Sequence, residues 1–125
     1  AVQALEFELS GLVHRAGEMI DRRQRQRVVR GELRIHRVRR GEQLVKTGGD
    51  ITVPCAKCHG DALMGLGDVP RLAGMQPVYI ARQLISMGNG SSAGTNSAPM
   101  KPVVAKLSED DVIAISAYLG SLPPR

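Results

Sequence analysis

The scarcity of aromatic side chains is the feature that most limits what this chain can fold into. Its 125 residues include one Phe, two Tyr and no Trp, although hydrophobic residues make up 42% of the sequence. Aromatic side chains normally supply much of the buried area of a small core, and a domain of this size is only marginally stable without them. The length suits one domain with at most an added arm. Something other than aromatic rings must therefore complete the core.

The two cysteines of the chain point to what that could be. Cys55 and Cys58 are followed at once by His59, which makes the pattern C-x-x-C-H. This is the attachment pattern of c-type haem, because two thiols three residues apart reach the two vinyl groups of one porphyrin. The adjacent imidazole can then bind the iron. We therefore predict one haem c, attached covalently through Cys55 and Cys58 with His59 as the proximal ligand, as the apolar centre of the core.

Other interpretations of the cysteine pair stay open. A C-x-x-C pair is also a thiol–disulfide redox motif, but that motif belongs beside a βαβ unit, and no convincing strand pair flanks it. A zinc site would need two further ligands, and the remaining histidines, His14 and His36, both lie in the first third of the chain. The pair could also be unreacted. Catalysis would need an open iron, and no distal acid–base pair is evident, so we predict an electron-transfer protein and not an enzyme.

The second axial ligand has several candidates. Met100 follows a stretch of small residues at 88–99 and stands between Pro99 and Pro102, so a loop can bring its thioether to the far side of the ring. We predict Met100 as the second iron ligand, with ordinary gap-filling as the alternative role. An open sixth position is a further alternative, and the other candidate ligands are Met19, Met64, Met75, Met87, His14 and His36.

Several short segments besides the cysteine motif carry a family resemblance. They are GEQLV at 41–45, PRLAG at 70–74, YIARQL at 79–84, APM at 98–100, LSEDD at 107–111 and AYL at 117–119. In this order and spacing, residues 39–122 resemble the class I c-type cytochromes, particularly the bacterial mono-haem and di-haem types.

The resemblance implies an all-α fold of short helices and long loops around one haem. It implies His59 and Met100 as axial ligands, and a hydrogen bond from the other ring nitrogen of His59 to the Pro70 carbonyl. It also implies that the first and last helices of the domain cross near Gly41 and Tyr118. The function that follows is one-electron transfer between larger redox partner proteins, through transient docking.

The first third of the chain is different in character. Residues 1–41 hold ten Arg and five acidic residues, which accounts for the whole net charge of +5. We divide the chain into residues 1–38, an amphipathic helix at 2–20 plus an Arg-rich arm of unclear role, and residues 39–125, the haem domain. Two interpretations of residues 15–40 stay open: a solvated charged face, and a contact with an acidic partner or an anionic membrane. Nucleic acid is not expected, because no aromatic residue is present there for base stacking.

The sequence also predicts local structure. We expect strand-like segments at 28–29 and 33–36 around a turn at 30–32, and one or two helical turns at 41–46 stopped by the glycines at 48 and 49. Pro77 should open a helix that Gly88 caps, and Ser108 should cap the last helix.

Two alternative functions remain beside free electron transfer: a cytochrome subunit or domain of a dehydrogenase or oxidase complex, and a basic-arm binding module. No run of 18 apolar residues is present, so we expect no transmembrane segment. Residues 1–20 lack the basic start and apolar run of a secretory signal. Because bacteria attach haem c outside the cytoplasm, we expect a periplasmic or otherwise extracytoplasmic location.

Overall fold

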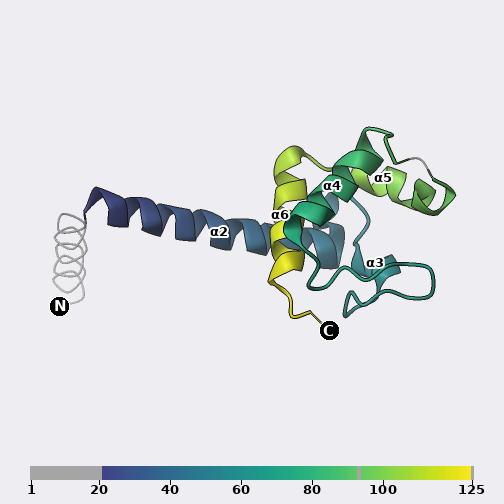
Figure 1. Cartoon of the computed structure of the whole chain (residues 1–125), viewed down its shortest axis with the longest axis horizontal. Coiled ribbons are helices and arrows are strands. Elements are labelled where there is room, and N and C mark those ends of the chain that lie inside the picture. Colours follow the sequence, from purple (N-terminus) through teal and green to yellow (C-terminus); the bar gives the residue numbers. More distant parts are fainter. Residues whose placement is uncertain (1–20, 93, 125) are drawn as a thin grey trace, which may run out of the picture. The chain divides into compact units, whose positions relative to one another are not determined.

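Figure 1 shows the chain as a computed structural model, in which residues 21–92 and 94–124 are described. The helix expected at 2–20 lies outside these ranges. By internal contacts the chain separates into two units, residues 1–34 and residues 35–125. This division falls inside helix α2 (Arg22–Thr47). The division at residue 38 stays a prediction.

The unit of residues 35–125 is built from short helical elements joined by loops. After the end of α2 come η1 (Gly48–Asp50), α3 (Ala56–His59), α4 (Pro77–Gly88), η2 (Thr95–Met100), α5 (Lys101–Val104) and α6 (Glu109–Ser121). Helix α4 packs against α6 and α5, and α5 against η2. Within the described ranges there is no β-strand, only an isolated bridge between Leu66 and Val69. The all-α prediction is therefore confirmed.

The strand-like segments expected at 28–29 and 33–36 are wrong, and so is the turn between them. All of these residues belong to α2. The Arg, Gln, Glu and Leu residues around them are good helix formers and outweigh the β-branched side chains. Gly31 costs the helix only about 1 kcal/mol relative to alanine, which is too little to break it.

The one or two helical turns expected at 41–46 are the end of the longer helix α2, so their expected start is wrong and their expected end is confirmed. Helix α2 ends at Thr47, before Gly48 and Gly49, whose φ angles are +79° and +56°. Pro77 begins α4, but Gly88 is its last residue and Asn89 is the cap. Ser108 caps α6 with a capping box: its hydroxyl accepts from Asp111 N, and the Asp111 carboxylate accepts from Ser108 N, both at 3.1 Å. The expected loop at 88–99 includes most of η2.

Helix α2 crosses α6 at Gly41, as the resemblance implied. A Cβ atom at Gly41 would collide with the Ala114 carbonyl and would lie 2.8 Å from Tyr118 Cβ. Only a residue without a side chain lets the two backbones approach this closely. The residue before Gly41 adds a polar contact: Arg40 Nε lies 3.4 Å from Asp111 Oδ1 and so joins α2 to the capped start of α6.

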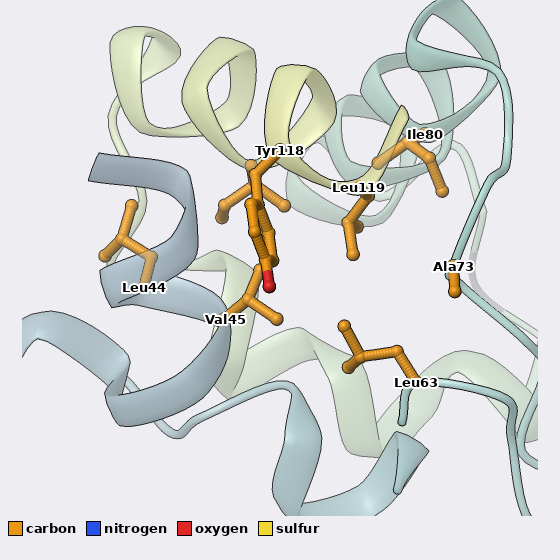
Figure 2. Close-up of a cluster of buried hydrophobic side chains, with 8 residues drawn as sticks. Leu44, Val45, Leu63, Ala73, Ile80, Tyr118 and Leu119 are labelled. Atoms are coloured by element: carbon orange, nitrogen blue, oxygen red, sulfur yellow. The ribbon is translucent and has the colours of Figure 1, made fainter. Parts of the chain in front are cut away.

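The core lies beneath this crossing. Figure 2 shows residues from α2, α4, α6 and the loop between α3 and α4 converging, with Tyr118 pointing from α6 towards Val45. Two of the eight residues in the cluster, Leu63 and Ala73, come from the loop, and the other six come from helices. The buried cluster consists of Leu44, Val45, Leu63, Ala73, Ile80, Ile115, Tyr118 and Leu119.

Candidate haem site

The cysteine motif lies on α3, directly below the core. Cys55 is the residue before the helix, and Cys58 and His59 are its last two residues. One turn of helix places Cys55 and Cys58 as neighbours, and His59 N donates to Cys55 O at 3.0 Å. Cys55 is half-buried against the core cluster and Cys58 is exposed; both are free thiols. Two unlinked thiols thus stand one turn apart at the edge of the core.

The environment of Cys55 does not suit a thiol–disulfide catalyst. Burial, helped by the nearby Cys58, raises the pKa of Cys55 to about 11. Redox-active cysteines have a lowered pKa because the thiolate is the nucleophile. No metal cluster supports the zinc interpretation either: in the part of the chain that the structure describes, no three His, Cys, Asp or Glu side chains group around a possible ion.

His59 is held in one orientation by the loop that follows it. The residue is 4% exposed, and its Nδ1 lies 2.7 Å from Pro70 O. A carbonyl oxygen can only accept, so Nδ1 carries the proton and the lone pair of the imidazole is on Nε2. This is the arrangement of a metal-ligating histidine, whose second nitrogen is oriented by a hydrogen bond.

The loop at 60–73 folds back so that Pro70 meets His59. Gly65 N donates to His59 O at 2.9 Å, and Leu63 O accepts from Leu72 N at 2.8 Å and from Ala73 N at 3.0 Å. Leu63 is buried and adopts a φ of +60°, a conformation that is costly for leucine. The structure therefore accepts backbone strain at Leu63 to keep the Pro70 segment against the motif.

The backbone of the loop passes very close to Gly65, so replacing this glycine should destabilise the protein. It has a φ of +81°, and a Cβ there would collide with Val69 O and lie 2.9 Å from the carbonyl carbon of Pro70. Gly65→Ala should lower the free energy of unfolding by about 3 kcal/mol, from left-handed strain plus displacement of Pro70. Urea unfolding measures this loss.

Gly67→Ala is the matched control. Gly67 also has a positive φ, +56°, but its Cβ would meet nothing within 4 Å. That variant should lose only about 1 kcal/mol, from strain alone. If both variants lost the same free energy of unfolding, the contact between Gly65 and the Pro70 segment would not contribute to stability.

Met100 lies on a separate segment, at the junction of η2 and α5, and is half-buried. It is not part of the core cluster, whereas Cys55 and Ala56 pack against that cluster. The segment is tied to the motif by Thr52, whose hydroxyl donates to Val103 O at 2.8 Å. The structure therefore brings Cys55, Cys58, His59 and Pro70 together, and anchors the Met100 segment to the residues before them.

The other candidate ligands fall elsewhere. Met75 packs against the core, Met87 is half-buried in α4, and Met64 is 40% exposed. His36 is exposed on α2, and Met19 and His14 lie outside the described residues.

Sequence reasoning missed Leu63 and Thr52. Nothing in the sequence marks a leucine that takes a left-handed conformation. The hydrogen bond from Thr52 to Val103 O joins residues 51 positions apart. Because every residue has a backbone carbonyl, no residue type in the sequence marks this partner.

The residues present fit a covalently bound haem. Two free thiols at attachment spacing stand beside a buried imidazole whose Nε2 has no hydrogen-bond partner among the described residues. The cluster beside them is apolar and contains a single aromatic ring, Tyr118. A helical fold with this site defines the class of c-type cytochromes.

The comparisons with known proteins agree with this class. Residues 38–123 match the family model for cytochrome c, and the chain belongs to the cytochrome c family. It is 38% identical over 76 residues to cytochrome c-554(547) of Halothiobacillus neapolitanus, covering 54% of this chain and 84% of that protein. It is 34% identical over 88 residues to the thiosulfate dehydrogenase electron acceptor of Stutzerimonas stutzeri, covering 66% of this chain and 39% of that protein.

A solved structure extends the likeness to the fold. Reduced recombinant cytochrome c4 from Pseudomonas stutzeri superposes with a TM-score of 0.61 at 29% identity, over 70% of this chain and 49% of the other. This chain therefore spans about half the length of that relative. Members of this family carry covalent haem c and transfer electrons to and from redox partner proteins, so the prediction of an electron-transfer protein is confirmed. No helix in the described ranges is long and apolar enough to cross a membrane.

Proposed function

We propose that this chain transfers single electrons between larger redox proteins through one haem c, attached by thioether bonds at Cys55 and Cys58. The observation that carries the proposal is the hydrogen bond of 2.7 Å between His59 Nδ1 and Pro70 O beside two free thiols. Haem c, when bound, supplies a reversible one-electron iron couple.

The chain's own residues have distinct tasks in this proposal. The cysteines would fix the position of the group, and His59 would donate its Nε2 lone pair to the iron. Pro70 O accepts from Nδ1, which orients the imidazole and increases its basicity. Met100 would supply a thioether as a second ligand to the iron, which would leave no coordination site for a substrate. Met/His ligation also favours a high reduction potential.

The intact mass of the denatured chain, after expression in a host that attaches haem c, tests the proposal. We expect a mass raised by one haem and a reversible one-electron titration. A bare chain from a host that loads a control cytochrome, or a mass raised by two haems, would contradict it.

Met100→Ala tests the second ligand. The variant should keep its haem, bind carbon monoxide rapidly, and have a lower reduction potential, because the thioether that favours the reduced iron is lost. Met64→Ala is the control, since Met64 is exposed and should leave the spectrum and the potential unchanged. If Met100→Ala kept the wild-type axial spectrum, Met100 would not be the ligand.

A second candidate function is that of a cytochrome domain within a dehydrogenase or oxidase assembly. It is favoured by the likeness to thiosulfate dehydrogenase (TsdBA) from Marichromatium purpuratum, which superposes with a TM-score of 0.63 at 33% identity over 70% of this chain and 19% of that chain. Here residues 39–125 are the haem domain and residues 1–38 a separate element.

We also infer an extracytoplasmic, periplasmic site of action, since bacteria attach haem c there. Residues 15–40 would then contact an acidic partner or an anionic membrane, which is supported by the exposure of the side chains at 21–37.

A further inference from the structure

A row of arginines runs along one face of α2 in the N-terminal unit. Arg23, Arg27, Arg30 and Arg34 follow one another at intervals of four, three and four residues. In a helix this spacing places all four on one face, over a length of about 16 Å. All four side chains are exposed. We call this set the arginine row.

No acidic side chain of the described part of this unit balances the row. Its acidic residues are Asp21 and Glu32. Glu32 falls on the side of α2 opposite the arginine row, because residues two apart do not face each other, and Asp21 precedes the first residue of the helix. Cations three and four residues apart repel and weaken a helix. A partner that carries a matching row of negative charge would remove this repulsion.

The residue type indicates what kind of anion fits. All ten basic residues between positions 15 and 40 are Arg and none is Lys. The planar guanidinium binds a carboxylate or phosphate through two parallel hydrogen bonds, whereas an ammonium acts as a point charge. The four guanidinium groups of the arginine row therefore suit a row of carboxylate or phosphate groups of similar length.

The apolar residues of this segment argue against a membrane as the partner. Val28, Val29 and Leu33 are each just over half exposed, and their helical positions spread over two sides of α2. A helix that lies in a membrane interface needs one broad apolar face, usually with aromatic anchors. Residues 21–34 contain no aromatic residue, which also removes the stacking platform of a single-stranded nucleic-acid site.

We propose that the arginine row docks onto a row of carboxylates on the surface of a partner protein. The proposal rests on the electron-transfer function proposed above, since an electron carrier must meet its partner through a brief, electrostatically guided contact. The arginine row adds an attachment site on the N-terminal unit, outside the haem domain.

Fluorescence anisotropy with the haem-loaded full chain tests this. The probe is a labelled helical peptide that carries Glu at intervals of four, three and four residues on an Ala/Gln background. A peptide of the same composition with scrambled Glu positions is the control. We expect the ordered peptide to bind more tightly, and its binding to weaken as NaCl is raised. Equal binding of the two peptides, or no binding at low salt, would overturn the proposal.

Two double variants of equal charge locate the contact. Arg27→Gln/Arg30→Gln removes the middle of the row and should weaken binding about tenfold. Arg22→Gln/Arg39→Gln removes two arginines outside it and should weaken binding less than about threefold. Glutamine keeps the helix propensity, which circular dichroism checks. Equal losses would mean that only net charge matters and would overturn the arginine row as the site.

Two further probes distinguish the class of partner. Tighter binding to vesicles of phosphatidylglycerol and phosphatidylcholine, or to a single-stranded oligonucleotide, than to the ordered peptide would overturn the choice of a protein partner. The redox titration and the haem content of the same samples separate this proposal from the proposed function. A variant that loses peptide binding but keeps both would leave electron transfer intact.

Discussion

Replacing Cys55 and Cys58 together by serine should yield a chain with no covalently bound haem. A serine hydroxyl does not form the thioether bond to a vinyl group, although it occupies nearly the same volume. Cys55 is half-buried against the core cluster and Cys58 is exposed, so the two sites differ in burial but stand one turn apart. Intact mass under denaturing conditions measures the outcome.

Ala56→Ser is the matched control, because it introduces the same hydroxyl between the two cysteines without removing sulfur. It should keep a full haem load. Cys55→Ser and Cys58→Ser singly should each keep one thioether, and His59→Ala should give no stable haem-loaded protein. A double serine variant that still carried haem after denaturation would show that the thiols are not the attachment points.

The second large effect concerns the crossing of α2 and α6. Gly41→Val should lower the free energy of unfolding by about 3 kcal/mol or more, because its side chain would meet the Ala114 carbonyl and Tyr118 Cβ at the helix crossing. Separating the helices would also open the buried cluster around Leu44 and Val45. Thermal and urea unfolding of the haem-loaded chain both measure this loss.

Gly31→Ala supplies the control on the same helix. A Cβ at Gly31 would meet nothing within 4 Å, so alanine there should stabilise α2 by up to about 1 kcal/mol through helix propensity alone. Opposite signs for the two substitutions would support backbone contact at Gly41. If Gly41→Val unfolded like the wild type, the close approach of the two helices would be refuted.

The chemistry of the chain could be predicted from local patterns. The spacing of Cys55, Cys58 and His59 is a contiguous motif, so its meaning does not depend on the fold. The capping box at Ser108 and the proline at the start of α4 are local for the same reason. The poverty in aromatic residues likewise indicated a core that needs an added group.

The predictions failed where the conformational preference of one or two residues was overruled by neighbouring residues or by tertiary contacts. The β-branched pair Val28-Val29 suggested a strand, but the helix formers around it prevailed. The left-handed conformation of Leu63 cannot be predicted from the local sequence. It depends on the hydrogen bonds that Leu63 O accepts from Leu72 N and Ala73 N. Its strain is compensated by contacts that do not form until the loop closes.

Sequence alone therefore determined the donor set: two thiols, one imidazole and a helical framework poor in rings, all encoded within short segments. Only the tertiary structure decided how those donors are held. The Pro70 carbonyl reaches His59 because Gly65 has no side chain and the backbone at 69–71 can pass close to it. In the same way, Gly41 lets the backbone of α2 approach that of α6. These contacts join residues far apart in the chain. Their energies depend on distances between backbones, which no local pattern of residue types encodes.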